Sequence, residues 1–176
     1  FLLVDIGGEV TDISMIKKNI LYESISFPLG RNFIIRGVAS ALDCSLSEAQ
    51  SYISLLQDGH AAEFVAKKLR PVISKFQLEW LYEFQKSLAN LSNDISVPAT
   101  IYLVVDKNLT DFFRRTIETE QFNQYTLTES KFKVISLGAE VFHAMAVFEN
   151  NIIRDPSLII DSIYINRFLT NPVLLR

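Results

Sequence analysis

The sequence feature that most constrains the fold is the stretch from Leu2 to Ile16, which has the pattern of two strands joined by a tight turn. The first residues form an apolar run typical of a buried strand, and Asp5 closes it. Gly7-Gly8 permits a turn with positive φ at no steric cost. A turn without Cβ atoms lets backbone N–H groups approach a phosphate, and an Asp at a strand end can hold a hydrated Mg²⁺. An ordinary hairpin without a ligand is the alternative interpretation.

The order of residues in this stretch makes it more specific. Asp5-Ile6-Gly7-Gly8, followed by Thr11-Asp12-Ile13, resembles the second phosphate-binding hairpin of the actin-like ATPase superfamily. Within that superfamily it looks most like the bacterial cell-division protein FtsA and the type IV pilus assembly protein PilM. Glu9 departs from the third glycine common in FtsA and is similar to the acidic residue of PilM-like proteins. The resemblance implies that Asp5 orients Mg²⁺ through water, and that Gly7, Gly8 and Thr11, with Asp12 in the same hairpin, cradle the terminal phosphates of ATP.

The resemblance also implies a fold and a domain organisation. We expect an α/β fold of the actin-like (ribonuclease H-like) type, with a mixed sheet, covering helices and a small helical upper subdomain. Residues 1–150 would be the second half of an actin-like ATPase domain, with a helical insertion at about 31–91, and residues 151–176 a C-terminal extension. Because the sequence opens directly on a core strand without an initiator methionine, we expect it to be a segment of a longer protein.

Hydrophobic periodicity and turn residues predict the individual elements. Strands are expected at 1–6, 11–17, 20–27, 99–105, 125–127 and 132–135, the first three antiparallel and those near 99–105 and 132–136 parallel additions. Helices are expected at about 32–42, 45–56, 61–91, 111–119 and 139–148, with Ser45 and Thr110 as N-caps. Pro71 should kink the longest helix or split it near Arg70. The apolar segment 158–165 fits either a strand or an amphipathic helix.

The adenosine-binding positions of the FtsA and PilM relatives are altered in this sequence. Those relatives carry Ala-Glu-x-x-Lys, with the Glu facing the ribose and the Lys beside the adenine, where this chain has Gln50 and Ile53. They follow a later strand with Gly-Gly, against which the nucleotide lies, where this chain has Val105 and Asp106. A further glycine of the family is replaced by Arg31, which adds a cation. The adenosine site is therefore predicted to be degenerate.

Composition disfavours several other classes of protein. The 176 residues have a net charge of −3, and charged residues of both signs are scattered along the sequence. This pattern argues against a nucleic-acid-binding surface. The single cysteine, Cys44, excludes an internal disulfide framework, and no apolar run reaches the ~20 residues of a membrane span. His60 and His143 lack neighbours at metal-ligand spacing. The sequence has no Rossmann, P-loop or hydrolase-elbow motif.

Two functions stay open from the sequence. The first is a non-catalytic assembly or scaffold protein that recruits partners in cell division or type IV pilus assembly, as the resemblance implies. Such a protein would be cytoplasmic, at most peripherally attached to the inner face of the membrane, and would contact other assembly proteins or itself. The second is an ATPase that binds ATP and Mg²⁺ when joined to an N-terminal half. The altered adenosine positions favour the first function, so we expect ATP to bind weakly or not at all.

Overall fold

The structure, a computed structural model, describes residues 1–91, 96–120, 131–138, 141 and 156–166. Two compact units divide the chain, Phe1–Ile135 and Ser136–Arg176. Almost all of the sheet and four of the helices belong to the first unit, and α5 (Pro156–Tyr164) belongs to the second. The strand predicted at 125–127 lies outside the described residues, as does the helix predicted at 139–148 apart from Val141.

The first unit is built on a mixed sheet with the strand order β3-β2-β1-β4-β5. The strands are β1 (Leu2–Ile6), β2 (Thr11–Lys17), β3 (Ile20–Phe27), β4 (Thr100–Val104) and β5 (Lys133–Ser136). A turn at Lys18 and Asn19 joins β2 to β3, and their φ values of 52° and 63° are those that a tight hairpin requires. The first three strands pair antiparallel and β4 pairs parallel to β1, so both of these predictions are confirmed.

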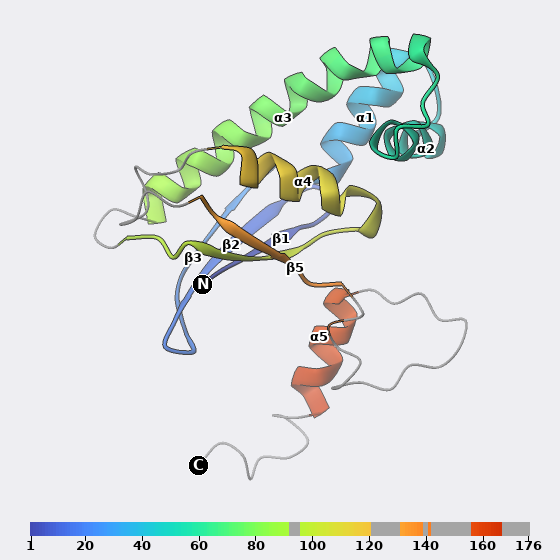
Figure 1. The fold of residues 1–176 in the computed structure, drawn as a ribbon. Coiled ribbons are helices and arrows are strands. Elements are labelled where there is room, and N and C mark those ends of the chain that lie inside the picture. The colour runs from blue at the N-terminus through green and yellow to red at the C-terminus, as the bar shows by residue number, and fades with distance from the viewer. Residues whose placement is uncertain (92–95, 121–130, 139–140, 142–155, 167–176) are drawn as a thin grey trace. The chain divides into compact units, whose positions relative to one another are not determined.

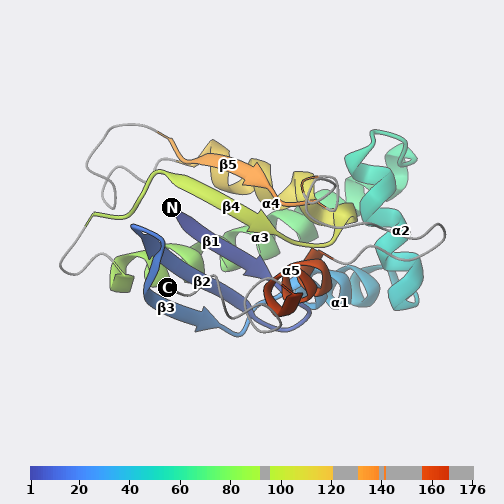
Figure 2. The same cartoon turned by 90° about the horizontal axis from the view of Figure 1, so that it is seen from below.

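Four helices of the first unit follow the order α1 (Arg31–Leu42), α2 (Leu46–Gln57), α3 (Glu63–Leu91) and α4 (Lys107–Thr119). Figure 1 shows α1, α3 and α4 on one side of the sheet, and Figure 2 shows the sheet from its other side. Along β1 the residues Leu2, Val4 and Ile6 are buried, and they alternate with half-buried ones. Alternate residues of a strand face opposite sides of the sheet, so the apolar set of β1 packs under the helices.

The predicted capping box at the start of α2 is present. The Ser45 hydroxyl accepts the N–H of Glu48, and the Glu48 carboxylate accepts the N–H of Ser45. The predicted cap of α4 is wrong, because α4 already begins at Lys107 and Thr110 lies within it. There the Thr110 hydroxyl donates to the carbonyl of Asp106.

α3 continues through Pro71, so the predicted split near Arg70 is wrong. A proline inside a helix costs about 3 kcal/mol, and burial on both sides of it offsets that cost. Leu69 before the proline and Trp80 after it are 0% and 1% exposed. Packing of the whole helix therefore outweighs the single unfavourable residue.

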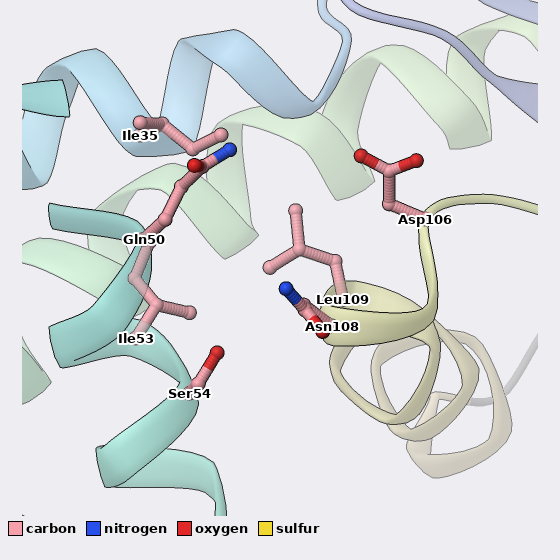
Figure 3. A pocket seen from close by; sticks show the side chains of 7 residues that line it. All are labelled: Ile35, Gln50, Ile53, Ser54, Asp106, Asn108 and Leu109. Carbon is pink, nitrogen blue, oxygen red and sulfur yellow. The ribbon is translucent and has the colours of Figure 1, made fainter. Parts of the chain in front are cut away.

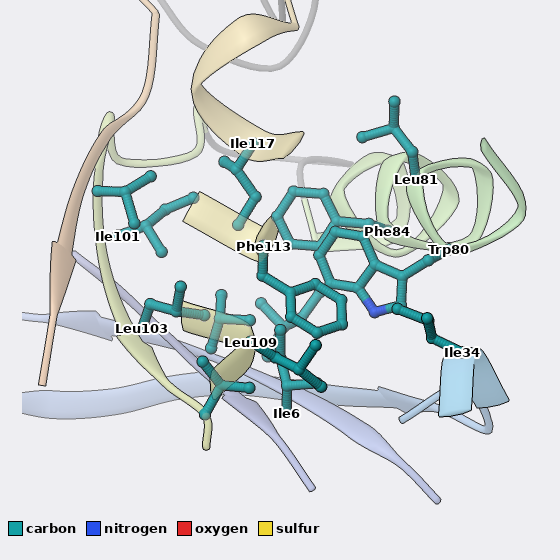
Figure 4. Packing of buried hydrophobic residues seen from close by; sticks show 14 of the residues in the cluster. Ile6, Ile34, Trp80, Leu81, Phe84, Ile101, Leu103, Leu109, Phe113 and Ile117 are labelled. Atoms are coloured by element: carbon teal, nitrogen blue, oxygen red, sulfur yellow. The ribbon is translucent and has the colours of Figure 1, made fainter. Parts of the chain in front are cut away.

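An aromatic cluster fixes α3 and α4 over the sheet (Figure 4). The Trp80 ring stacks on Phe84 with centroids 4.9 Å apart and meets the edge of Phe113 at 5.1 Å. α1 also lies very close to α3, since a Cβ added at Gly37 would lie 1.9 Å from the Phe76 ring. Trp80 and Phe84 of α3 therefore belong to the core, and the contact at Gly37 holds the middle of α1 against α3.

In the second unit the structure describes the helix α5. The segment 158–165, for which the sequence allowed a strand or a helix, is therefore helical. No helix in the described part of the chain combines the length and the apolar character that crossing a membrane requires.

Candidate functional site

The predicted phosphate hairpin lies at the edge of the sheet where β1 and β4 end. Asp5 pairs with Val104 in parallel register, so the carboxyl ends of the two strands meet there. α1 and α4 begin at the same edge, with Gly30 and Asp106 as their N-cap residues. Ligands of open α/β sheets bind at the carboxyl ends of the strands. The predicted site therefore occupies the edge at which a ligand would be expected.

The glycines of this region serve a close approach between the hairpin and α1. The N–H groups of Arg31 and Asn32 donate to the carbonyls of Gly7 and Gly8, each at 2.9 Å. A Cβ on Gly30 would lie 2.5 Å from both of these carbonyl oxygens. Gly7 and Gly8 do not use the positive φ that glycine permits, because Gly59 is the glycine with positive φ among the described residues. Two N–H groups at the helix start, where an anion could bind, are thus satisfied by the hairpin itself.

The hydroxyl of Thr11 is enclosed in the core. Thr11 is 0% exposed, its Oγ1 donates to the carbonyl of Leu29 at 2.7 Å, and it accepts the indole N–H of Trp80 at 3.1 Å. Trp80 comes from the middle of α3, far along the chain. The residue that the resemblance assigns to phosphate binding therefore ties the hairpin to the segment before α1 and to the aromatic cluster.

Glu9, at the tip of the hairpin, is held by two side chains of α1. Arg36 contacts both carboxylate oxygens, at 2.6 Å and 2.8 Å, and the Asn32 amide donates to one of them at 2.9 Å. The hydrogen bond from Arg36, followed by that from Asn32, lowers the pKa of Glu9 to about 2. The carboxylate is consequently charged at any ordinary pH and clamps the turn onto the helix.

Asp5 and Asp12 are the carboxylates that could hold a cation in the hairpin. They lie directly opposite each other on the neighbouring strands β1 and β2, and Asp12 also accepts a hydrogen bond from Ser26. Carboxylate oxygens suit Mg²⁺, which keeps several waters and takes one or two carboxylates. The described residues contain no group of three or more His, Cys, Asp or Glu side chains that could hold a metal ion. Mg²⁺ bound through water to Asp5 therefore stays a prediction from the resemblance.

The predicted adenosine positions converge on a pocket between α2 and the start of α4 (Figure 3). The residues lining the pocket are Ile35, Gln50, Ile53, Ser54, Asp106, Asn108 and Leu109. The room inside the pocket that compares with published cavity volumes is about 20 Å³, which is far below the ~300–1,000 Å³ of typical ligand sites. Its lining is neutral except for one carboxylate, so it offers no cation to a phosphate.

The pocket brings three of the four predicted adenosine positions together and leaves out the fourth. Gln50, Ile53 and Asp106 line it, whereas Val105 is 8% exposed and belongs to the apolar core. Ile53 is 2% exposed, so its side chain also fills space within the core. The resemblance matches Ile53 to a lysine and Val105 to a glycine.

Two residues that depart from the family pattern pair with each other. The Arg31 Nε atom lies 3.0 Å from a carboxylate oxygen of Asp106, and the two side chains are 33% and 49% exposed. The pair links the first turn of α1 to the N-cap of α4 beside the pocket. A cation at a helix start is unfavourable by itself, and the carboxylate of Asp106 offsets this.

Sequence reasoning missed Arg36 and Trp80, although each has a signal in the sequence. Arg36 lies one helical turn beyond Asn32 and so shares its face of α1, which is where a partner for Glu9 could be sought. Trp80 carries an indole N–H that needs an acceptor when the ring is buried. Neither signal identifies the partner, because the contacts join segments that are distant in the sequence.

Comparison with known proteins adds information on the fold. No protein-family model matches the sequence, and no curated protein matches it either. Among solved structures, the PilM-PilN type IV pilus biogenesis complex aligns with a TM-score of 0.61 at 16% identity, covering 94% of this chain and 45% of the other. The chain has an actin-like fold. The fold class predicted from the sequence is thereby confirmed.

Two further solved structures are similar at lower scores. The ethanolamine utilization protein EutJ from Carboxydothermus hydrogenoformans aligns with a TM-score of 0.47 and 20% identity, covering 76% of this chain and 43% of that chain. The (R)-2-hydroxyglutaryl-CoA dehydratase component A of Acidaminococcus fermentans aligns with a TM-score of 0.39 and 13% identity, covering 77% and 54%. This chain therefore spans about half the length, or less, of each protein it resembles.

Proposed function

We propose that the chain is a non-catalytic part of an actin-like assembly protein, which recruits other assembly proteins and does not depend on bound nucleotide. The observation that carries this proposal is the ion pair between Arg31 and Asp106 beside the pocket. It joins the starts of α1 and α4 at the carboxyl edge of the sheet, where a ligand would be expected. It also places a carboxylate at the rim of a pocket that has no cation in its lining.

The hairpin supports the same proposal. Its Thr11 hydroxyl and the N–H groups of Arg31 and Asn32 already have partners within the protein. A phosphate would have to displace these bonds, and a buried donor or acceptor left without a partner costs about 1–3 kcal/mol. The hairpin therefore acts as scaffolding in this proposal.

The partners follow from the similarity to PilM, which is solved in a type IV pilus biogenesis complex with PilN. We infer that this chain likewise contacts assembly proteins, either of a pilus or of the division machinery. Its place would be the cytoplasm or the inner face of the membrane, in keeping with the FtsA and PilM resemblance.

The competing function is an ATP-binding actin-like ATPase. In its favour, Asp5, Gly7, Gly8 and the Thr11-Asp12 pair keep the order of the phosphate hairpin at the carboxyl edge of the sheet. ATP with Mg²⁺ would then depend on a cleft completed by the rest of a longer protein. Asp5 would hold the hydrated cation, and the bound Mg²⁺ would neutralise phosphate charge.

Calorimetric titration of the full-length protein with Mg-ATP separates the two functions. Loss of two charged contacts to the adenosine, at about 1.5–3 kcal/mol each, weakens binding by roughly two to four powers of ten. We therefore expect a dissociation constant in the millimolar range or no measurable heat. A low-micromolar constant would overturn the non-catalytic proposal.

A double variant tests the ion pair as the cause. Arg31→Gly with Asp106→Gly removes the pair without touching the buried Ile53 or Val105, and we expect it to bind Mg-ATP about twofold more tightly than the unaltered protein, as the ~0.5 kcal/mol of an exposed pair allows. The matched control removes the exposed pair that Arg114 and Asp111 form within α4 at 2.8 Å. That control should leave the titration unchanged. If the double variant gains nothing, the ion pair is not what excludes nucleotide.

A further inference from the structure

The outward face of α3 carries a continuous line of exposed residues that the proposed function does not use. Its large apolar members Phe64, Leu78 and Tyr82 are 70%, 66% and 64% exposed. We call the line the outer seam of α3; it consists of Phe64, Lys68, Pro71, Lys75, Leu78 and Tyr82. Figure 1 shows α3 crossing one face of the sheet, with its N-terminal end beyond the strands.

The spacing of the outer seam is that of a helix-packing surface. Successive members are four, three, four, three and four residues apart, and this alternation keeps side chains on one line when a second helix packs alongside. Single exposed apolar residues are normal on a protein surface. Three large ones on one line, with lysine stems between them, form an apolar strip that a second helix can cover.

Charge along α3 identifies which helix fits. The half from Glu63 to Lys75 carries four cations and one carboxylate, Lys67, Lys68, Arg70, Lys75 and Glu63. The half from Phe76 to Leu91 carries two carboxylates and one cation, Glu79, Glu83 and Lys86. The two halves have opposite net charge, so an antiparallel copy of α3 brings each half against its complement.

We propose that the outer seam binds α3 of a second copy of this chain, antiparallel and about a two-fold axis near Ile73. In this register Phe64 faces Tyr82 of the second copy, and Lys67 faces Glu79. By symmetry each contact occurs twice, as in any isologous interface. The aromatic pair and the Lys67–Glu79 pair coincide in one alignment of the two helices. The same alignment sets Glu63 against Glu83 near each end of the interface, which weakens it.

The size of the outer seam sets the strength of the association. From Phe64 to Tyr82 it extends about 27 Å at 1.5 Å per residue. One helix against one helix over that length falls short of the ~1,200 Å² of a standard stable interface. The dimer should therefore be weak and visible only in its concentration dependence.

Sedimentation velocity of the full-length protein over about 1–500 µM tests the proposal. We expect reversible dimerisation, and Leu78→Glu should raise the dimer dissociation constant about tenfold or more, because it removes an apolar side chain and adds a repulsive charge. The matched control is Leu46→Glu on α2, at a leucine that is 55% exposed outside the seam. The control should dimerise as the unaltered protein does.

A charge swap tests the register. Lys67→Glu and Glu79→Lys should each raise the dissociation constant about threefold or more, and the two together should restore most of the loss. Glu79 also contacts Lys75 of its own helix at 3.8 Å. That contact is lost in both Glu79→Lys variants, so the coupling reports on the pair between copies.

Three results would overturn the proposal. The protein could remain monomeric at every concentration, Leu46→Glu could disrupt the dimer as much as Leu78→Glu, or the double charge swap could recover nothing. None of these measurements depends on nucleotide, so the proposed function can fail separately.

Discussion

The phosphate hairpin and the pocket beside α2 differ in how their sequences relate to their structures. The hairpin keeps the residue order of an ATP-binding family, yet the Thr11 hydroxyl and the N–H groups that face Gly7 and Gly8 are engaged inside the protein. The pocket has other residues at the positions that the resemblance assigns to adenosine, and Asp106 there pairs with Arg31. The hairpin matches the pattern of the resemblance and the pocket departs from it, but in each region a polar side chain, that of Thr11 or that of Asp106, has its partner within the protein.

The difference teaches that a motif can have a folding role that is independent of its ligand. Gly30 is required by the close approach of the hairpin to α1, and Thr11 joins three segments in the core. A chain that no longer bound nucleotide would still need both residues in order to fold. Gln50, Asp106 and Asn108 of the pocket are exposed and lie outside the core, so we expect substitution of these residues to cost less.

The largest expected effect comes from Gly30→Ala in the hairpin region. The added Cβ would lie 2.5 Å from the carbonyl oxygens of Gly7 and Gly8, so backbone would have to move. We expect the free energy of unfolding to fall by about 3 kcal/mol, as for other overpacked sites, measured by urea denaturation.

Gly59→Ala serves as the control for Gly30→Ala. A Cβ at Gly59 meets nothing within 4 Å, and its φ of 73° adds only local strain, which costs about 1 kcal/mol. Equal losses in the two variants would mean that close approach is not the reason for glycine at position 30.

The next largest loss of stability is expected from Thr11→Val, which keeps the shape of the side chain and removes the hydroxyl. The carbonyl of Leu29 and the indole N–H of Trp80 then lose a buried partner, and we expect a loss of about 2 kcal/mol in the free energy of unfolding. Thr119→Val, at an exposed hydroxyl near the end of α4, should change it by less than about 0.5 kcal/mol. A Thr11→Val loss as small as that of the control would show that the buried hydroxyl contributes little.

Sequence reasoning predicted most of the fold because strong periodicity and turn residues report on local structure. The three opening strands, the capping box of Ser45 and the helix around Trp80 all follow from neighbours within a few residues. Pro71 led to the prediction of a kink or a split because proline is unfavourable inside a helix. Packing on both sides of Pro71 outweighs that local cost, and the helix continues. The start of α4 was missed because an acceptable cap, Thr110, lay inside the real helix.

The site was less predictable, since its contacts join distant segments. The resemblance led to Gln50, Ile53 and Asp106, which do share a pocket. It could not indicate that Arg31 pairs with Asp106, or that Thr11 binds a tryptophan 69 residues away. Considered alone, each altered residue indicates only that a contact to adenosine is missing. The pairing between two of them becomes visible only when their side chains lie side by side.

A smaller effect is expected from the ion pair that borders the pocket. Arg31 and Asp106 are 33% and 49% exposed, so solvent screens them and their coupling should be about 0.5 kcal/mol in a double-mutant cycle of unfolding. In 1 M salt, where the Debye length is about 3 Å, the coupling should largely disappear. A coupling that persists in 1 M salt would contradict a screened pair.

The smallest expected effect is a change in the pKa of Glu9. The bonds from Arg36 and Asn32 lower the pKa of Glu9 from 4.5 to about 2. A depressed carboxyl pKa stabilises the folded state above pH 4.5, and this stabilisation is lost as the pH falls from 4.5 through about 2.

Carboxyl NMR shifts should show Glu9 titrating near 2 in the unaltered protein. In Arg36→Gln the pKa of Glu9 should be close to its ordinary value, because the largest cause of the shift is gone. Glu48 is the internal control, since its pKa is lowered by Ser45 and should not respond to Arg36→Gln. If Glu9 of the unaltered protein titrates near its ordinary value, the hairpin tip is not clamped to α1 in solution.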